Sequence, residues 1–198
     1  MFLDRDGVIN ENEPGTYVHD WSAFRFVPGA VESIAALHRA GYPVIVITNQ
    51  AGIGRGHMTA AALSDIHRRM MAAVEAHGGR IDAIFHCPHV PEAACECRKP
   101  QPGLLRRAAR ELDLDLHRSV FIGDNVTDVQ ASLAAGCRPL LVLTGHGRRS
   151  QVALAADPEL RAVEVAEDLA AAALRILNRV ESQQKHRHDT LGPDVQHH

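Results

Sequence analysis

Short apolar runs alternate with longer amphipathic segments along most of this chain. The runs with the character of buried strands span residues 2–3, 43–48, 81–85, 119–122 and 140–143. The segments with helical spacing of apolar residues span 28–40, 59–79, 102–112, 126–135 and 167–179. Strands that alternate with helices are typical of a parallel sheet with helices on both faces. The pattern therefore predicts a doubly wound, Rossmann-like α/β fold.

The length of the chain leaves room for one domain. We assign residues 1–180 to it, because 198 residues lie within the usual size of a single core. The intervals from Asp6 to Thr48 and from Gln50 to Lys99 are filled by the predicted elements, so neither holds a large cap domain. Residues 181–198 are polar and without periodicity, and we expect them to form a disordered tail.

Charge and hydropathy exclude several kinds of partner. The chain has 21 basic and 24 acidic residues, and this net charge of −3 gives no general attraction to nucleic acid or to an anionic membrane. No apolar run approaches the ~18 residues that a membrane span needs, and Met1 leads directly into Phe2 and Leu3 without a signal segment. We therefore expect a cytoplasmic monomer that acts on a small molecule.

Polar side chains follow three of the predicted strands. Asp4 and Asp6 come after the first strand, Thr48-Asn49-Gln50 after the second, and Gly123-Asp124-Asn125 after the fourth. Any one of these groups could be a helix cap or a loop. The carboxyl ends of parallel strands meet at one edge of a sheet, where such folds bind their ligands. Together the three groups predict a functional site at that edge.

The residue types at this edge favour phosphate chemistry. Asp4, Asp6 and Asp124 would repel one another unless a cation lies among them, and Mg²⁺ suits such hard oxygen ligands. A carboxylate beside Mg²⁺ can attack phosphorus and form an aspartyl-phosphate, while a second acid moves the protons. The Thr48 hydroxyl, the backbone N–H of Asn49 and the ammonium of Lys99 are suitable donors to the transferred phosphoryl group.

These motifs resemble the haloacid dehalogenase-like superfamily of phosphohydrolases. The resemblance covers positions 2 to about 145 and rests on Asp4-Arg5-Asp6-Gly7-Val8, a strand ending in Thr48, Lys99, and Gly123-Asp124 followed by Asp128. Segments 4–10, 49–56 and 95–100 further resemble a branch that includes heptose-bisphosphate and histidinol-phosphate phosphatases. The resemblance implies a phosphomonoester hydrolase, with the 7-phosphate of a heptose 1,7-bisphosphate, used in lipopolysaccharide core synthesis, as the leading substrate.

The resemblance also implies roles for individual residues. Asp4 would be the nucleophile, and Asp6 the general acid and base, whose backbone carbonyl also binds Mg²⁺. Asp124 would complete the Mg²⁺ ligands, with Asn125 and Asp128 in support. The expected substrate-binding and phosphate-binding residues are Thr48, Asn49, Gln50, Arg55, Arg98 and Lys99.

A cluster of soft ligands lies between the second and third groups. Cys87 and His89, followed by Cys95 and Cys97, supply three thiols and one imidazole in two close pairs, enough for a closed structural zinc site. The alternative is three buried free thiols. Zinc would fix a loop over residues 86–99, and the end of that loop would deliver Arg98 and Lys99 to the phosphate site. His57 and His86 are not expected to be ligands.

The glycine-rich run at residues 51–56 lacks the Gly-Lys-Ser/Thr ending of a nucleotide-binding loop. We interpret it as a flexible loop that presents Arg55 to the substrate. Histidinol phosphate is the rival substrate, although Arg55 and Arg98 favour a polyanionic sugar over an aminoalcohol. Two further readings are a phospho-accepting signalling domain and a zinc-stabilised binding module with a decayed active site. The Asp4/Asp6 spacing opposes the first, and the complete set of polar residues opposes the second.

Overall fold

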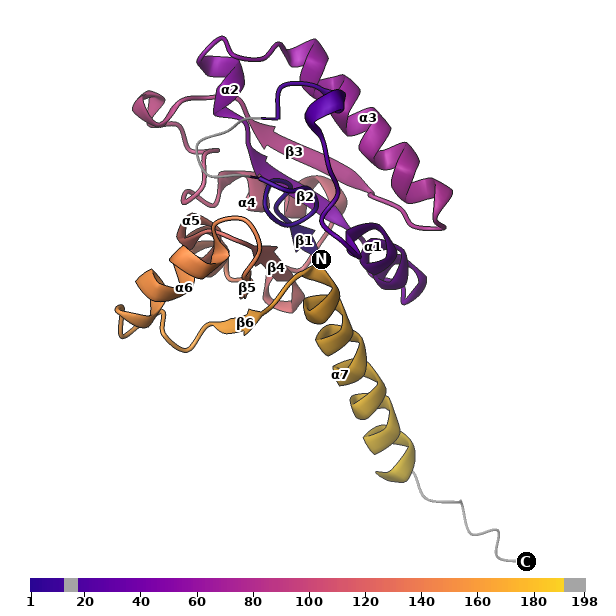
Figure 1. Cartoon of the computed structure of the whole chain (residues 1–198). Coiled ribbons are helices and arrows are strands. Elements are labelled where there is room, and N and C mark those ends of the chain that lie inside the picture. The colour runs from indigo at the N-terminus through magenta and orange to yellow at the C-terminus, as the bar shows by residue number, and fades with distance from the viewer. Residues whose placement is uncertain (13–17, 191–198) are drawn as a thin grey trace, which may run out of the picture.

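The computed structural model of the chain describes residues 1–12 and 18–190 (Figure 1). Six strands of this part of the chain form one sheet: β1 (Phe2–Leu3), β2 (Ile45–Asn49), β3 (Ala83–Cys87), β4 (Val120–Gly123), β5 (Arg138–Val142) and β6 (Glu164–Ala166). Their spatial order is β3-β2-β1-β4-β5-β6, and all neighbouring strands are parallel. The chain builds the sheet outward from β1 in two directions, so the predicted doubly wound fold is confirmed.

β1 has only two residues and still occupies the centre of the sheet. Phe2 lies beside Ile45 of β2 on one side and Phe121 of β4 on the other. The backbone N–H of Asp4 then donates to the carbonyl of Ile122 at 2.9 Å, which extends the pairing by one residue. The direction of winding reverses between β1 and β4, and the crevice at such a switch point is where this kind of sheet binds ligands. Asp4 lies directly at this point.

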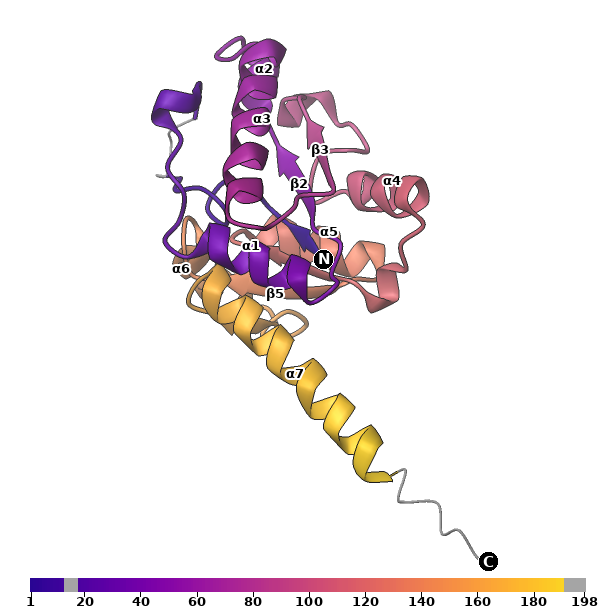
Figure 2. The ribbon, with the colours of Figure 1, turned by 90° about the vertical axis from the view of Figure 1, so that its right-hand side faces the viewer.

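The helices cover both faces of the sheet. They are α1 (Ala30–Arg39), α2 (Ala51–Gly54), α3 (Ala60–Ala76), α4 (Gly103–Leu112), α5 (Val126–Ala135), α6 (Gly147–Ala155) and α7 (Leu169–Thr190). Figure 2 shows α1 and α3 on one side of the strands and α4 on the other. Three short 3-10 helices, Trp21–Ala23, Pro91–Ala93 and Leu116–Arg118, lie in the connections.

Alternate residues of the strands supply the two halves of the core, because side chains of a strand point to opposite faces in turn. Leu3 and Val46 pack with α1, α3 and α7, for example against Ile34 and Ile66. Phe2, Ile45 and Ile47 face the other side and pack with Leu104 and Leu105 of α4. Burial on both faces explains why the strands read as continuous apolar runs in the sequence.

Several elements differ from the sequence prediction. β6 and α6 were not predicted, because Glu164–Ala166 is too short for a periodic signal and α6 begins with the polar run Gly147-Arg148-Arg149-Ser150. The glycine-rich run expected to be a flexible loop forms the helical turn α2 over Ala51–Gly54. The backbone N–H of Gly54 donates to the carbonyl of Pro88 at 3.0 Å, and a Cβ on Gly54 would lie 2.8 Å from that oxygen. Glycine is therefore needed there for close contact with the loop over residues 86–99, here called the Cys loop.

Helix α7 continues past the predicted end at Arg179 to Thr190 and extends away from the rest of the molecule in both views (Figures 1 and 2). The tail that we expected to be disordered from residue 181 is thus helical over 181–190, where Glu, Gln, Lys and Arg favour helix. Residues 191–198 lie outside the described residues. No helix in the described part of the chain is long and apolar enough to cross a membrane.

Candidate active site

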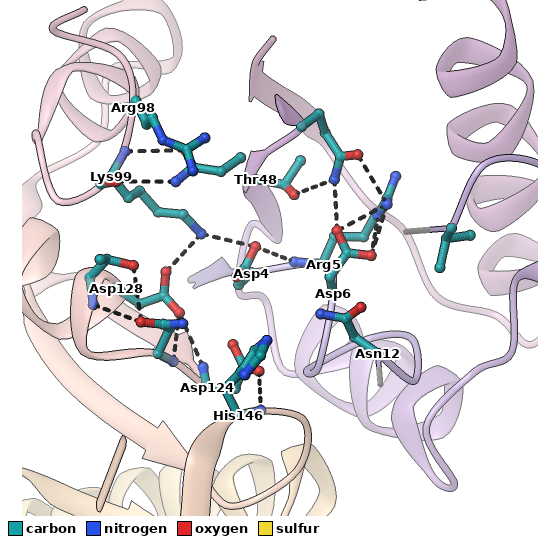
Figure 3. A pocket seen from close by; sticks show the side chains of 15 residues that line it. Asp4, Arg5, Asp6, Asn12, Thr48, Arg98, Lys99, Asp124, Asp128 and His146 are labelled. Atoms are coloured by element: carbon teal, nitrogen blue, oxygen red, sulfur yellow. Dashed lines mark hydrogen bonds and ion pairs between the residues drawn. The ribbon is translucent and has the colours of Figure 1, made fainter. Parts of the chain in front are cut away.

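A cavity of about 370 Å³ opens at the carboxyl ends of the central strands. Its wall is formed by fifteen residues: Asp4, Arg5, Asp6, Asn12, Val18, Thr48, Asn49, Gln50, Arg98, Lys99, Asp124, Asn125, Thr127, Asp128 and His146. Figure 3 shows their side chains converging from the ends of several strands. The structure thus brings together every predicted site residue of the sheet edge except Arg55.

Three buried carboxylates lie together on one side of the cavity. The ligand oxygens of Asp4, Asp124 and Asp128 are within 4.8 Å of one another. Burial, with the neighbouring Asp128 charge, raises the pKa of Asp4 to about 7 and that of Asp124 to about 8, against the opposing effect of Lys99. Carboxylates whose pKa values stay raised even beside Lys99 favour a further bound cation. The donor set, all hard oxygens, fits Mg²⁺.

Asp124 is held in place by two loops. Its carboxylate accepts a hydrogen bond from the backbone N–H of His146 at 2.7 Å, in the loop after β5. It also lies against Gly7, which has a φ of +83°, and a Cβ at Gly7 would come within 2.0 Å of the Asp124 carboxylate oxygen. Glycine is therefore required at position 7 by both its backbone conformation and the approach of Asp124.

Lys99 is the cation that faces these carboxylates. Its Nζ is 2.9 Å from Asp4 and 2.7 Å from Asp128, and it also donates to the carbonyl of Ile47 at 3.1 Å (Figure 3). The side chain of Asn49 fixes the backbone of Lys99: its amide nitrogen donates to the Lys99 carbonyl, and its oxygen accepts from the Lys99 N–H, each at 3.1 Å. These contacts explain how a residue at the end of a long loop is delivered accurately to the strand ends.

The carboxylate of Asp6 points away from the group of three acids. It accepts from Arg5, from the side-chain amide of Asn10 at 3.0 Å and from that of Gln50 at 2.7 Å. Burial opposes ionisation, but Arg5 and these hydrogen bonds hold the pKa of Asp6 below its usual value. We expected Asp6 to crowd with Asp4 and Asp124. The structure corrects this expectation: Asp128 is the third clustered carboxylate, because Arg5 draws the side chain of Asp6 to the other side.

The end of β2 connects the two sides of the cavity. Thr48 is buried, and its hydroxyl accepts a hydrogen bond from the side-chain nitrogen of Gln50 at 2.9 Å. The same nitrogen contacts Asp6, so Thr48, Gln50 and Asp6 form one connected chain. The backbone N–H of Gln50 donates to the carbonyl of Cys87 at 2.7 Å, which ties this strand end to the Cys loop.

Helix α5 begins just after the end of β4 with a capping box. Asn125 is the N-cap, and its side-chain oxygen accepts from the backbone N–H of Thr127 at 3.2 Å. Asp128 accepts from the backbone N–H groups of Asp124 and Asn125 at 3.1 and 3.0 Å. The other oxygen of Asp128 is the one that pairs with Lys99. Asp128 thus links the start of α5 to the cation in the cavity.

The soft ligands predicted from the sequence converge at one point. The Sγ atoms of Cys87, Cys95 and Cys97 are 3.2–3.5 Å apart, and Nδ1 of His89 is 3.3 Å from Cys97 and 3.6 Å from Cys87. All four ligand atoms lie within 4.8 Å of one another, which fits a tetrahedral Cys₃His metal site. Burial and a hydrogen bond with Cys97 raise the pKa of Cys87 to about 12. A thiol buried so unfavourably for ionisation would need a metal to become a thiolate.

The Cys cluster lies directly beside the cavity. Arg98 follows Cys97 and donates from its guanidinium to the carbonyl of His89 at 3.2 Å. The side chains of Arg98 and Lys99 both line the cavity, as the sequence predicted for the end of this loop. Arg55 does not. It is exposed at the end of α2 and absent from the cavity wall, because residues 51–54 form a helical turn rather than a loop that reaches the substrate.

Five residues of the cavity wall were not predicted: Arg5, Asn12, Val18, Thr127 and His146. His146 follows β5, so the rule that strand ends converge could have identified it, but the sequence after this strand lacks an acidic or amide signal. Arg5 lies inside the quoted motif between two aspartates. Its side chain gave no signal of its own, since a surface ion pair would have been equally consistent with that spacing.

Comparison with known proteins identifies the family. A HAD-hydrolase-like family model matches residues 96–172. The chain is 43% identical over 177 residues to the D-glycero-beta-D-manno-heptose-1,7-bisphosphate 7-phosphatase of Bordetella bronchiseptica, covering 89% of this chain and 97% of that protein. It is 39% identical over 177 residues to the enzyme of the same name from Pseudomonas aeruginosa, with the same coverage.

A solved structure shows the same relationship. The D,D-heptose 1,7-bisphosphate phosphatase of B. bronchiseptica, complexed with magnesium and phosphate, superposes with a TM-score of 0.85 at 42% identity, covering 90% of this chain and 98% of that one. The likeness extends over nearly the whole of both chains. The chain therefore belongs to the haloacid dehalogenase-like phosphatases, in the family of the D-glycero-beta-D-manno-heptose-1,7-bisphosphate 7-phosphatases.

Proposed function

We propose that this phosphatase removes the 7-phosphate of D-glycero-D-manno-heptose 1,7-bisphosphate by way of an aspartyl-phosphate on Asp4, in the synthesis of lipopolysaccharide core heptose. The observation that carries the proposal is the 43% identity over 89% of the chain to a phosphatase of that name. The open cavity, lined by Lys99 and Arg98 and without a cap over it in the described residues, suits a small polyanionic sugar. The cytoplasmic location and the monomeric state stay predictions.

The first half of the reaction uses Asp4 and Asp6. An oxygen of Asp4 attacks the phosphorus atom, the bond from phosphorus to the sugar oxygen breaks, and the carboxyl proton of Asp6 passes to that leaving oxygen. Asp6 is ionised in the resting site, and it takes up a proton from solvent when the substrate binds, because the negative charge of the bound phosphate dianion raises its pKa. Lys99, Thr48 and the backbone N–H of Asn49 hold the phosphoryl oxygens.

The second half returns the site to its starting state. A water molecule attacks the phosphorus of the aspartyl-phosphate and gives a proton to Asp6, and the bond from phosphorus to Asp4 breaks to release inorganic phosphate. Lys99 stays paired with Asp128, so the cation keeps its position while Asp4 is phosphorylated. Asp6 thus acts first as acid and then as base, and it returns its proton to solvent when phosphate leaves, which restores the ionised carboxylate.

Mg²⁺ is the cofactor we assign to the acidic group. Asp4 and Asp124 would hold it through their carboxylates, and Asp6 through its backbone carbonyl. Bound Mg²⁺ supplies charge neutralisation for the phosphoryl oxygens. The solved relative complexed with magnesium and phosphate supports this assignment, as do the closely spaced buried carboxylates of Asp4, Asp124 and Asp128.

Zinc is the metal we assign to Cys87, His89, Cys95 and Cys97. Four protein ligands leave no open position, so the role of the metal is to hold the loop rather than to activate water. The contacts of the loop support this assignment, because it continues directly into Arg98 and Lys99 and is packed against α2 through Gly54.

The substrate is tested by measuring phosphate release from heptose 1,7-bisphosphate and from histidinol phosphate by the purified protein with Mg²⁺. We expect rapid loss of the 7-phosphate alone from the sugar, located by ³¹P NMR, and a much lower kcat/KM for histidinol phosphate. A higher kcat/KM for histidinol phosphate would overturn the substrate assignment while leaving the phosphatase chemistry intact. Loss of the 1-phosphate instead would overturn the assignment of the 7-phosphate as the group that is removed.

A further inference from the structure

Arg5 is a cation buried directly behind Asp6. Its side chain is 1% exposed, although it is one of the largest side chains in the protein. One terminal nitrogen donates to both carboxylate oxygens of Asp6, at 2.8 and 3.0 Å, and Nε lies 3.2 Å from the nearer oxygen. The same terminal nitrogen reaches the side-chain oxygen of Gln50 at 3.3 Å. The planar guanidinium therefore fixes both the position and the rotation of the Asp6 carboxylate.

His67 supports Arg5 from the helix layer. Its Nε2 is 3.3 Å from the other terminal nitrogen of Arg5. Arginine has no acceptor, so Nε2 of His67 must accept this hydrogen bond and the ring must be neutral. Burial, together with the charge of Arg5, lowers the pKa of His67 to about 3, which agrees with a neutral ring. His67 lies on α3, a helix that contributes no residue to the cavity wall.

We propose that Arg5, held in turn by His67, is a positioning residue that fixes the carboxylate of Asp6 for proton transfer to the leaving oxygen of the substrate. This inference rests on the proposed phosphatase function. It assigns a task to two residues outside the group that touches phosphate or metal. It also gives α3 a part in the reaction, through a single hydrogen bond in its middle.

A purely structural role would predict something different. The Arg5 to Asp6 pair could serve only to satisfy buried charges, and then any residue that fills the space of His67 would do. If the pair positions Asp6, the acceptor atom at position 67 matters, because without it the guanidinium is free to rotate away. The hydrogen bonds and ion pairs of Thr48, Asn49 and Lys99 are made with residues other than His67, so binding of the phosphate group should not change.

The test compares His67→Leu, which removes the acceptor, with His67→Gln, whose side-chain oxygen can replace it. We expect His67→Leu to lower kcat on the sugar phosphate by ~10- to 100-fold, the scale of an ångström of misplacement, with little change in KM. We expect His67→Gln to recover most of this loss. His86→Leu is the matched control, because His86 is an exposed residue of β3 whose ring lies 6.1 Å from that of His67, and its loss should leave the rate unchanged.

A second substrate separates proton transfer from general damage to the site. p-Nitrophenyl phosphate has a leaving group that departs without a proton, so a misplaced acid should cost it less than it costs a sugar phosphate. We therefore expect a smaller loss of kcat for His67→Leu with the aryl ester. Equal losses with both esters, an unchanged rate in His67→Leu, or equal losses in the Leu and Gln variants would overturn the inference.

Crystal structures of the Leu and Gln variants provide a readout that needs no activity. The expected result is an Asp6 carboxylate displaced or disordered in His67→Leu and in its original place in His67→Gln. An Asp6 carboxylate that stays in place in both variants would overturn the inference. This outcome is independent of which phosphate ester the wild-type protein hydrolyses. Arg5→Lys, which keeps the charge but lacks the planar fork, should lower kcat as His67→Leu does.

Discussion

The two candidate metal sites in the described part of the chain are built in opposite ways. The acidic group takes Asp4 from the end of β1 and Asp124 and Asp128 from the end of β4 and the start of α5, so it exists only when the sheet is assembled. The Cys cluster takes all its ligands from one short segment, Cys87 to Cys97. The acidic ligands are deeply buried, whereas His89 is exposed. The first group lies at the proposed reacting atoms and depends on the whole fold, whereas the second would fix one loop.

This comparison predicts a ranking of effects. Changes at the acidic group should remove the chemistry and leave the fold, because the strands that carry these residues are held by apolar packing on both faces. Changes at the Cys cluster should lower the rate indirectly, through the position of Arg98 and Lys99. A larger loss of rate from a change in the Cys cluster than from a change of Asp4 would contradict this distinction.

The largest effect is expected for Asp4→Asn. An amide cannot attack phosphorus, and the change in volume is small, so turnover should be abolished with the fold retained. Steady-state phosphate release measures turnover, and circular dichroism measures whether the fold is retained. Asp65→Asn on the exposed face of α3 is the control, because its ion pairs with Arg68 and Arg69 lie at the surface and should not affect the rate. Appreciable turnover by Asp4→Asn would exclude Asp4 as the nucleophile.

Asp124→Ala should raise the Mg²⁺ concentration needed for half-maximal activity by ~10²-fold or more, because one of two carboxylate ligands is lost. The measurement is a Mg²⁺ titration of phosphate release. Saturating Mg²⁺ should restore part of the rate, which distinguishes a lost ligand from a lost nucleophile. An unchanged Mg²⁺ requirement would transfer the ligand role to Asp128, whose carboxylate lies in the same group.

Cys95→Ala should release one equivalent of metal and lower kcat by up to ~10²-fold, because Arg98 and Lys99 would be misplaced by an ångström or so. Metal content by mass spectrometry and phosphate release are measured on the same preparation. Cys137→Ala is the matched control, since Cys137 is a buried free cysteine that is not one of the four clustered ligands. Purified protein without zinc, or zinc loss with an unchanged rate, would defeat the positioning role.

The sequence was most informative where the spacing of apolar residues and the types of polar residue point to the same structure. The alternation of apolar runs predicted the doubly wound sheet, and strand ends predicted that Asp4, Thr48 and Asp124 converge, because parallel strands share one edge. The Cys and His ligands could be found because their spacing is local. Helix α2 could not be predicted, since the glycine-rich sequence of Ala51–Gly54 opposes helix on propensity and only contact with Pro88 reveals why it forms.

The direction of the Asp6 side chain was likewise beyond the sequence. Two aspartates two residues apart on an extended chain should point the same way, and we expected Asp6 to join Asp4. Arg5 lies between them in sequence, but its partner His67 is on a different element and appears only in the folded protein. Positioning contacts of this kind depend on long-range packing, and single-sequence patterns do not encode them.

The smallest expected effect concerns stability and pH, and it depends on the acidic group alone. Burial raises the pKa of Asp4 to about 7 and that of Asp124 to about 8, so the folded protein holds these protons more tightly than the unfolded chain. In metal-free protein this contribution to stability is present at low pH and is lost as the pH rises through about 7 to 8.

Mg²⁺ binds the ionised carboxylates, so it should raise the Tm little at about pH 6 and more at about pH 8.5. Mg²⁺ at a concentration of 100 times its Kd stabilises the folded state by about 2.7 kcal/mol. Thermal unfolding with and without Mg²⁺ at both pH values measures the difference, and Asp124→Ala should show almost none of it. The Cys cluster lies outside the acidic group, so Cys95→Ala should retain the Mg²⁺ effect. A Mg²⁺ shift in Tm that is as large at pH 6 as at pH 8.5 would show that these carboxylates are already ionised in the metal-free fold. The raised pKa values of Asp4 and Asp124 would then be wrong.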